Sequence, residues 1–267
     1  MTNNALKRSL NLPLLTLYGL GTILGAGVYV LVGKVAGIAG LYAPIAFLIS
    51  AIVALFTGLS YAALSARYPR SAGEVVYINQ AFSSATLSTS VGWCVIATGV
   101  VSAATMVNGF IGYLTVFIQI PTLLAVTLIV GSITLIAYWG IMESVTIAAL
   151  ITVLEIVGLL LVIYSLRGEL LTLPHQWQTL LPPVNGDIWF GILLGAFLAF
   201  YAFIGFEDMV NVAEEVVAPQ RTLPIAIIAA LLMASVLYIL IALAAVLSLP
   251  PDVLSQSDSP MVMLIEN

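Results

Sequence analysis

Long apolar runs, separated by short polar stretches, fill most of the sequence. A transmembrane helix needs about 20 consecutive, mainly apolar residues. Seven runs come close to or exceed this length, and they are 13–35, 42–66, 85–117, 121–138, 144–166, 188–212 and 223–249. Between them, 75–82 is predicted as a short interfacial helix and 167–187 as a more polar connection. The pattern predicts an all-α polytopic membrane protein with seven spans.

The composition agrees with a chain embedded in a lipid bilayer. Hydrophobic residues make up 62% and charged residues 7%, against about 25% charged residues in soluble domains. Because cytoplasmic loops carry an excess of lysine and arginine, we expect a multi-pass protein of the plasma membrane with its N-terminus in the cytoplasm. This orientation places Lys7, Arg8, Arg67, Arg70 and Arg221 inside and Lys34 and Arg167 outside. No basic run suggests a nucleic-acid partner.

The first apolar run is unusual because four glycines interrupt it between residues 17 and 28. Each glycine costs about 1 kcal/mol relative to alanine in a helix interior. A broken helix explains them, since its free backbone N–H groups and the positive end of the following half-helix bind an anion such as a carboxylate. The alternative is close packing of two helices on Gly21 and Gly25, which form a GxxxG pattern.

A second break is predicted in the sixth run, within residues 197–208. This stretch is rich in aromatic residues, and Gly205 is followed closely by Glu207 and Asp208. A break at 202–205 would lie near the middle of the span. The alternative is a helix that ends at the cytoplasmic interface with an aromatic belt and ordinary solvated carboxylates.

Four motifs occur in an order that is typical of one transporter superfamily. The stretches 21–28 (GTILGAGV) and 200–207 (FYAFIGFE) look like its two unwound helices. The stretches 68–77 (YPRSAGEVVY) and 213–224 (AEEVVAPQRTLP) look like the loops that follow its second and sixth helices. The sequence therefore resembles the amino acid–polyamine–organocation (APC) permease superfamily over essentially its whole length.

The resemblance implies an inverted-repeat (LeuT-like) transporter fold with discontinuous first and sixth helices. Residues 1–166 would form the first five-helix repeat and 167–186 an extracytoplasmic connection. Residues 187–267 would form an incomplete second repeat, with helices six and seven and the start of an eighth. Family members usually continue beyond the seventh span. We therefore expect either a fragment truncated after about seven spans or a partner chain that supplies the missing helices.

The resemblance also implies secondary active transport of an amino acid by alternating access, through proton-coupled symport or exchange. The substrate carboxylate would meet backbone N–H groups near Gly27, and the amino group would meet carbonyl groups of both breaks. Tyr201 would close over the substrate, or else serve aromatic packing. An apolar pocket favours a small or branched neutral amino acid, while polyamines and cationic amino acids stay open. The implied substrate-binding residues are Ile23, Gly25, Ala26, Gly27, Phe200, Tyr201, Ala202, Phe203 and Ile204.

Glu155 lies midway through the fifth run, where a carboxylate costs about 2.5–3.5 kcal/mol on insertion scales. We expect it to bind and release a coupling proton, although sodium stays open as the coupling ion. The alternative is a protonated residue in a structural hydrogen bond. Four charged residues are candidates for a cytoplasmic gate or for a solvated loop face, and they are Arg67, Glu214, Glu215 and Arg221.

Other functional classes fit the sequence less well. A retinal protein needs a lysine in its last helix, but none follows Lys34. A seven-helix ligand receptor fits the number of spans, and the four ordered motifs argue against it. An intramembrane enzyme needs a catalytic constellation, whereas the single histidine, His175, lies in a loop. We expect no enzymatic activity, no cofactor and no metal. An inactive or regulatory permease fragment is the remaining alternative.

Overall fold

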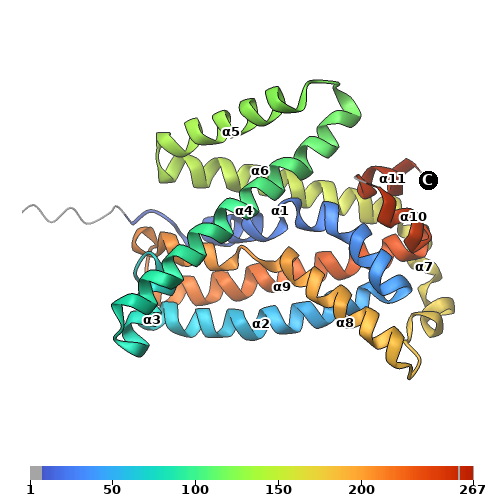
Figure 1. Ribbon diagram of the computed structural model, residues 1–267, viewed down its shortest axis with the longest axis horizontal. Coiled ribbons are helices and arrows are strands. Elements are labelled where there is room, and N and C mark those ends of the chain that lie inside the picture. Colours follow the sequence, from blue (N-terminus) through green and yellow to red (C-terminus); the bar gives the residue numbers. More distant parts are fainter. Residues whose placement is uncertain (1–7, 258, 267) are drawn as a thin grey trace, which may run out of the picture.

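The computed structural model describes residues 8–25, 27–257 and 259–266 and consists almost entirely of helices (Figure 1). The α-helices are α1 (Leu12–Ala39), α2 (Ala43–Arg67), α3 (Gly73–Phe82), α4 (Ala85–Phe117), α5 (Thr122–Trp139), α6 (Ile141–Ser165), α7 (Arg167–Gln176), α8 (Gly186–Phe200), α9 (Pro219–Ser248), α10 (Pro251–Gln256) and α11 (Pro260–Glu266). The 3₁₀ helices are η1 (Gly40–Tyr42), η2 (Trp177–Leu180), η3 (Tyr201–Phe203) and η4 (Phe206–Glu215). Within the described residues the fold is all-α, as predicted.

Several helices begin at a residue that caps their free N–H groups. The side-chain oxygens of Asn11, Ser84 and Asn185 accept hydrogen bonds from the first turns of α1, α4 and α8. Such a cap satisfies backbone donors that have no partner within the helix. These polar residues therefore fix where three of the apolar runs start.

Six stretches of the described residues are long and apolar enough to cross a membrane, and they are Gly27–Arg67, Ala85–Phe117, Thr122–Trp139, Ile141–Ser165, Gly186–Glu215 and Pro219–Ser248. The sequence predicts seven, because it counts 13–35 as one span. The structure divides this run at Gly25, so that Leu12–Gly25 is a shorter apolar helix and the second half of α1 continues into α2. The chain is a multi-pass membrane protein, and the break in α1 accounts for the different count.

Two predicted segments differ from the structure. The connection at 167–187, in which His175 is predicted to lie in a loop, is mostly helical, because α7 and η2 occupy most of it and His175 lies in α7. The sixth span, predicted as a helix from 188 to 212, is α-helical only as far as Phe200 and continues as η3 and η4. The backbone leaves the helical conformation at Ile204 and Gly205, and the segment after it forms the tighter 3₁₀ helix. The interfacial helix predicted at 75–82 is present as α3, which begins at Gly73.

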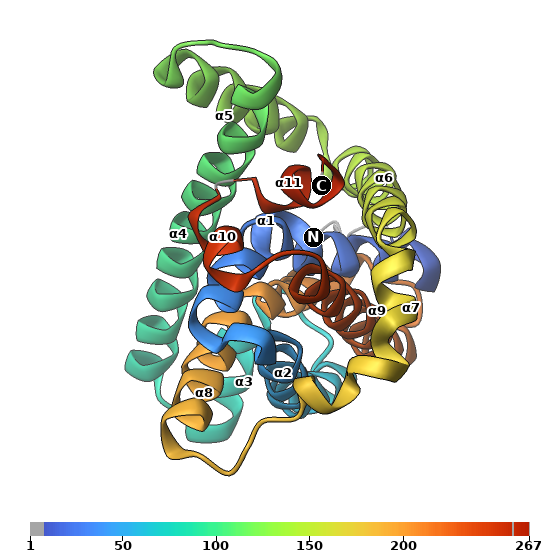
Figure 2. The same cartoon turned by 90° about the vertical axis from the view of Figure 1, so that its right-hand side faces the viewer.

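The buried core lies between α1, α2, α8 and α9. Small residues let these helices approach closely. Gly58 of α2 lies against Leu231 of α9, and Gly195 of α8 lies against Ala39 of α1. Figures 1 and 2 show α5 at the edge of the molecule, with α4 and α6 leading to it. The side chains of α4 and α5 are mostly exposed and apolar, as expected where helices face lipid or other apolar surfaces.

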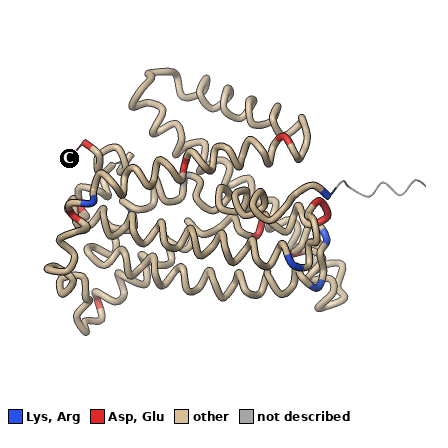
Figure 3. The backbone as a smooth tube through the Cα atoms, turned by 180° about the vertical axis from the view of Figure 1, so that it is seen from behind, with Lys and Arg blue, Asp and Glu red and all other residues tan. Residues whose placement is uncertain are grey.

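Charged residues gather at the two ends of the helices, with few between them (Figure 3). Arg67 ends α2 and Arg221 lies in the first turn of α9, and these ends coincide because the two helices run antiparallel. At the opposite end, Nζ of Lys34 donates a hydrogen bond to the carbonyl of Ser255 over 2.8 Å. These cations thus lie at opposite ends of the bundle, whereas Lys7 lies outside the described residues.

Candidate functional site

The first helix break lies at Gly25, whose φ of 27° and ψ of −154° are not helical. L-residues that carry a Cβ are strained at such a φ, whereas glycine adopts it readily. A Cβ at this position would also lie 3.1 Å from Cε of Met106 on α4. The predicted break in the first helix is therefore confirmed, and a second half-helix starts beyond it.

Close packing, the alternative explanation of the glycines, also occurs in α1. Gly19 lies against the side chain of Met209 on η4, and Gly21 lies against Oγ1 of Thr152 on α6. A methyl group at either position would overlap these neighbours. The glycine cluster therefore serves two purposes, because it packs the first half of α1 tightly and breaks the helix after it.

The second break follows α8. Ile204 has an extended backbone with ψ of 137°, and Gly205 has φ of 130° and ψ of −24°. The N–H of Gly205 donates a hydrogen bond to Oε2 of Glu207 over 2.8 Å, which places a carboxylate at the N-terminus of η4, where negative charge is favoured. The predicted break in the sixth helix is confirmed.

The two breaks touch each other. A Cβ on Gly27 would lie 3.0 Å from Cα of Ala202, and a Cβ on Gly205 would overlap the carbonyl of Thr22. The hydroxyl of Thr22 lies 2.9 Å from the carbonyl oxygen of Gly205 and donates a hydrogen bond across the gap, sharing its proton with the carbonyl of Gly19. The expectation that the breaks face each other is confirmed, and the absence of side chains at two glycines allows the contact.

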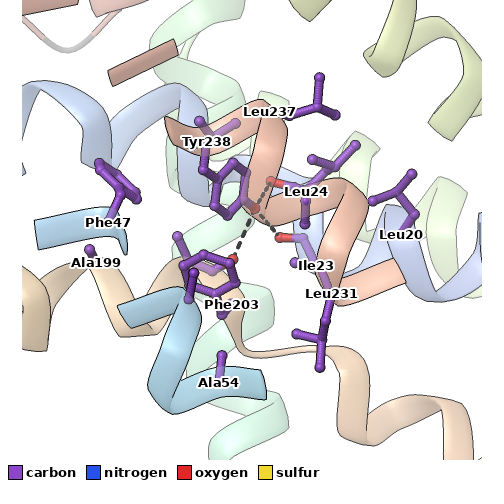
Figure 4. Packing of buried hydrophobic residues seen from close by; sticks show 14 of the residues in the cluster. Leu20, Ile23, Leu24, Phe47, Ala54, Ala199, Phe203, Leu231, Leu237 and Tyr238 are labelled. Atoms are coloured by element: carbon purple, nitrogen blue, oxygen red, sulfur yellow. Dashed lines mark hydrogen bonds between the residues drawn. The ribbon is translucent and has the colours of Figure 1, made fainter. Parts of the chain in front are cut away.

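Tyr238 of α9 reaches between the breaks, as Figure 4 shows. Its hydroxyl lies 2.6 Å from the carbonyl oxygen of Ile23 and 2.9 Å from that of Ala202. The side chain is completely buried. A buried tyrosine hydroxyl usually finds a hydrogen-bond partner, and here the partners belong to both breaks.

A cavity of about 540 Å³ opens on one side of the breaks, within the range of about 300–1,000 Å³ that small-molecule sites occupy. Residues of both breaks line it, and α4 contributes hydroxyl and amide groups through Ser102, Thr105 and Asn108. No charged side chain of the described residues lines this first cavity. It is suited to a small molecule whose charges are met by the backbone.

A second cavity, of about 760 Å³, opens on the other side of the breaks. Lysine and arginine are absent from its lining within the described residues. Four carboxylates line it, namely Glu74, Glu155, Glu207 and Asp208. This second cavity is therefore acidic, in contrast to the first.

The two cavities extend in opposite directions from the breaks. Leu31, in the second half of α1, lines the first cavity, whereas Tyr18, in the first half, lines the second. Ile204, Ser102 and Met106 line both. A molecule held at the breaks therefore lies where the two cavities meet.

The candidate substrate residues occupy different places around the breaks. Phe200 lines the second cavity. Phe203 is fully buried, with its ring centroid 5.0 Å from that of Tyr238, so only its backbone is near the site. Gly25 forms the first break itself, and Ala26 lies outside the described residues. The candidates that line the first cavity are Ile23, Gly27, Tyr201, Ala202 and Ile204.

Glu155 is half-buried on α6 and lines the second cavity only. The hydroxyl of Tyr29, in the second half of α1, donates a hydrogen bond to the backbone carbonyl of Glu155 over 3.3 Å. This contact leaves the Glu155 carboxyl group available to the cavity. The residue is thus close to the breaks but apart from the uncharged first cavity.

The four gate candidates lie at the end of the bundle that is predicted to be cytoplasmic. The guanidinium of Arg67 lies 5.5 Å from the ring centroid of Tyr68. The backbone carbonyl of Glu215 accepts hydrogen bonds from the N–H groups of Ser9 and Leu10 over 2.8 and 3.0 Å. The structure thus ties the segment before α1 to the end of η4 through the backbone, while a gate formed by Arg67, Glu214, Glu215 and Arg221 stays a prediction.

Glu74 of α3 lies at the same end and lines the second cavity. The hydroxyl of Tyr61 donates a hydrogen bond to its Oε1 over 3.0 Å. Burial raises the pKa of Glu74 above its usual 4.5, although hydrogen bonds from its own backbone and from Tyr61 lower it. Burial, together with the nearby Glu74, also raises the pKa of the neighbouring Tyr77 to about 12. Burial thus shifts the titration of Glu74 and of Tyr77 toward higher pH.

Sequence reasoning missed two features of the site. The hydroxyl of Tyr238 is a polar group within the apolar run 223–249, and this could have identified the residue as a site candidate. The pattern does not say, however, which face of α9 meets the breaks. The bridge between Leu10 and Val216 joins segments that are far apart in the chain. No local pattern signals such a pairing.

Known proteins resemble this chain over nearly its whole length. The chain matches the family described as "Amino acid permease" over residues 10–266. It is 30% identical to "Branched-chain amino acid permease BcaP" of Bacillus subtilis (strain 168), over 98% of this chain and 60% of that protein. It is 28% identical to "Cationic amino acid transporter 3, mitochondrial" of Arabidopsis thaliana, over 96% of this chain and 45% of that protein. It is 29% identical to "Cationic amino acid transporter 4" of Homo sapiens, over 92% of this chain and 42% of that protein.

The chain thus spans 42–60% of the length of these three relatives. The relatives are named as transporters rather than enzymes, and the resemblance drawn from the four motifs is confirmed. Because the family match extends over nearly every residue, including both breaks, the chain belongs to the amino acid permease family.

Proposed function

We propose that this chain forms the amino-acid-binding part of a secondary active transporter in the plasma membrane, with its N-terminus in the cytoplasm. The observation that carries the proposal is the meeting of two broken helices at the junction of two oppositely directed cavities. Helix breaks are tolerated at membrane depth where they line a cavity and bind something. A substrate held there would be reached from one side or the other in alternation.

The backbone supplies both charges that an amino acid needs. The substrate carboxylate would bind the N–H groups at the start of the second half of α1, near Gly27, because the half-helix dipole is positive there. The substrate ammonium would bind carbonyl oxygens of the breaks, including those of Ile23 and Ala202. Tyr201, which lines the first cavity, would cover the ligand.

The lining of the first cavity favours a neutral, branched amino acid. Ile23, Val30 and Ile204 present apolar side chains to it, and charged side chains are absent from its described lining. The Bacillus subtilis relative is named for branched-chain amino acids. A cationic amino acid or polyamine is the second candidate, because four carboxylates line the second cavity and two of the relatives are named for cationic amino acids.

Binding measurements on the purified chain in lipid nanodiscs test the site. Radiolabelled leucine and arginine distinguish the two substrate classes. Gly27→Ala should weaken binding at least about tenfold, because its Cβ would lie 3.0 Å from Cα and 3.2 Å from Cβ of Ala202 and the facing backbone at the substrate site must shift slightly. Gly131→Ala is the matched control, since no atom lies within 4 Å of its Cβ and it lines neither cavity. Equal binding by Gly27→Ala and the unchanged chain would refute the site.

We further propose that Glu155 carries the coupling proton. It faces the second cavity, which holds other carboxylates and opens toward the predicted cytoplasmic end. Glu155→Gln mimics the protonated state permanently, so uptake driven by a proton gradient should be lost while exchange of one amino acid for another continues. Glu143→Gln, at the exposed start of the same helix, is the control. Gradient-driven uptake that persists in Glu155→Gln would refute this role, and dependence on a sodium gradient would assign the other ion.

A further inference from the structure

We propose that Tyr238 is a positioning residue for substrate binding, whose hydroxyl joins the two helix breaks and orients the carbonyl groups that receive the substrate ammonium. This inference rests on the proposed function as far as the ammonium is concerned. The joining of the breaks rests on the geometry alone.

The geometry around the Tyr238 hydroxyl is that of a single donor shared between two broken helices (Figure 4). The oxygen lies 2.6 Å from the carbonyl oxygen of Ile23 and 3.3 Å from that of Leu24, both in the first break. It lies 2.9 Å from the carbonyl oxygen of Ala202, in the second break. A hydroxyl has one proton to donate, so moving either break away would remove part of this shared interaction.

The ring of Tyr238 is held in place independently of its hydroxyl. Its centroid lies 5.0 Å from that of Phe203 and 5.9 Å from that of Phe47, with both pairs in edge-to-face geometry. Such aromatic pairs, added to complete burial, fix the ring orientation. The hydroxyl is therefore presented to the breaks by a rigid support from α2 and the second break.

Among the described residues, Tyr238 is the one hydrogen-bond donor to the Ala202 carbonyl. In a continuous 3₁₀ helix, the N–H of Gly205, three residues later, would donate a hydrogen bond to this carbonyl. Here it donates to the Glu207 side chain instead. A buried carbonyl without a partner is costly. Tyr238 thus satisfies a group that the broken helix leaves free.

The same carbonyl groups are available to a substrate. A carbonyl oxygen has two lone pairs, and a hydrogen bond from Tyr238 uses one of them. Ile23 and Ala202 both line the first cavity. Tyr238 fixes the orientation of both carbonyl groups from the buried side, so that their remaining lone pairs point in defined directions. This lowers the cost of ordering the site when an ammonium binds.

Tyr238→Phe tests the inference because it removes one oxygen atom and keeps the ring between Phe47 and Phe203. Tyr113→Phe is the matched control. The hydroxyl of Tyr113 also donates to a carbonyl of α1, that of Tyr29, over 2.6 Å. Its acceptor lies in the second half of α1 rather than at a break, so the control loses the same kind of hydrogen bond elsewhere.

The first measurement is the dissociation constant of radiolabelled leucine for each variant in nanodiscs, with the thermal midpoint of the ligand-free protein beside it. Tyr238→Phe should bind leucine about tenfold more weakly, the effect of one lost hydrogen bond of typical strength at the site. Tyr113→Phe should keep its affinity even if its midpoint falls equally. Unchanged affinity in Tyr238→Phe, or an equal loss in both variants, would overturn the positioning role.

The second measurement needs no ligand. A Cβ on Gly27 would lie 3.2 Å from Cβ of Ala202, close to the spacing of about 3.5–4.5 Å in a disulfide. The pair Gly27→Cys and Ala202→Cys, with Cys94→Ser, should therefore form a disulfide on mild oxidation. Adding Tyr238→Phe should slow its formation about tenfold, whereas adding Tyr113→Phe should not.

The two measurements separate the inference from the proposed function. A chain that binds no amino acid but shows the slower cross-linking refutes the proposed function and supports the joining role of Tyr238. Cross-linking that proceeds equally fast with Tyr238→Phe overturns that role, whatever the chain binds.

Discussion

Replacing Gly205 with alanine tests whether the contact between the two breaks depends on a missing side chain. Gly205 has φ of 130°, a conformation that L-residues other than glycine rarely adopt. Its added Cβ would overlap the carbonyl oxygen of Thr22 and lie 2.6 Å from the carbonyl carbon. Because these atoms are backbone, no side-chain rotation relieves the overlap, and the two breaks must separate.

The cost follows from two contributions. A residue held at an unfavourable φ costs about 1–3 kcal/mol. Separation of the breaks also removes the hydrogen bond from the Thr22 hydroxyl to the Gly205 carbonyl, now 2.9 Å long, which contributes about 0.5–1.5 kcal/mol. The free energy of unfolding should therefore fall by about 2–4 kcal/mol. For a chain of this size we expect the midpoint of thermal unfolding to fall by roughly 5–15 °C.

Thermal unfolding of the purified chain, followed by tryptophan fluorescence or by size-exclusion chromatography after heating, measures this change. Gly131→Ala is the control, because Gly131 lies within α5 and no atom is found within 4 Å of its Cβ. That substitution should leave stability unchanged or raise it by up to about 1 kcal/mol. If Gly205→Ala unfolds at the same temperature as the unchanged chain, the breaks do not touch as described.

Two further predictions concern the predicted cytoplasmic end and the topology. Burial raises the pKa of Glu74 above its usual 4.5, so the folded chain binds this proton more tightly than the unfolded chain, and stability falls as pH rises from 4.5 through the folded pKa. Glu74→Gln should flatten this part of a stability–pH curve. Glu169→Gln, at an exposed position in the first turn of α7, should not. Parallel curves for the Glu74→Gln variant and the unchanged chain would contradict the assignment. In a cysteine-free background, we expect cysteines that replace Ser71 and Gln220 to be labelled from one side of the membrane and a cysteine that replaces His175 to be labelled from the other. Labelling of all three from one side would refute the orientation.

The helices and both breaks could be predicted from the sequence because their signals are local. Apolar length identifies a span, and the glycines near Gly25 and at Gly205 identify positions where other residues would be strained or would overlap a neighbour. The first break also changed the number of spans, since a run of the right length does not reveal that its halves belong to different segments. The sequence also did not predict the 3₁₀ geometry of η4 or the helical form of α7. The composition of η4 does not distinguish a 3₁₀ helix from an α-helix, and that of α7 does not distinguish a helix from a loop.

The interior of the site could be predicted only in part. The two breaks contribute mainly backbone groups, so their residue types say little about which side chains face a cavity. Phe203 lies in the predicted second break, yet its ring belongs to the core. Tyr238 comes from the apolar helix α9, and its ring packs against Phe47 and Phe203 where its hydroxyl meets the breaks. The division into two repeats and the cytoplasmic gate stay predictions.

The central claim is that the carboxylate of an amino acid binds the backbone at the start of the second half of α1. Solid-state NMR on the chain in lipid measures this directly, with leucine carrying ¹³C in its carboxyl group and the chain carrying ¹⁵N in its glycines. An N–H···O hydrogen bond from Gly27 or Gly25 places the carboxyl carbon about 4 Å from a glycine nitrogen. The account predicts dephasing of the bound ¹³C signal that corresponds to this distance. Bound leucine whose carboxyl carbon shows no glycine nitrogen within about 6 Å, well beyond hydrogen-bond geometry, would contradict it.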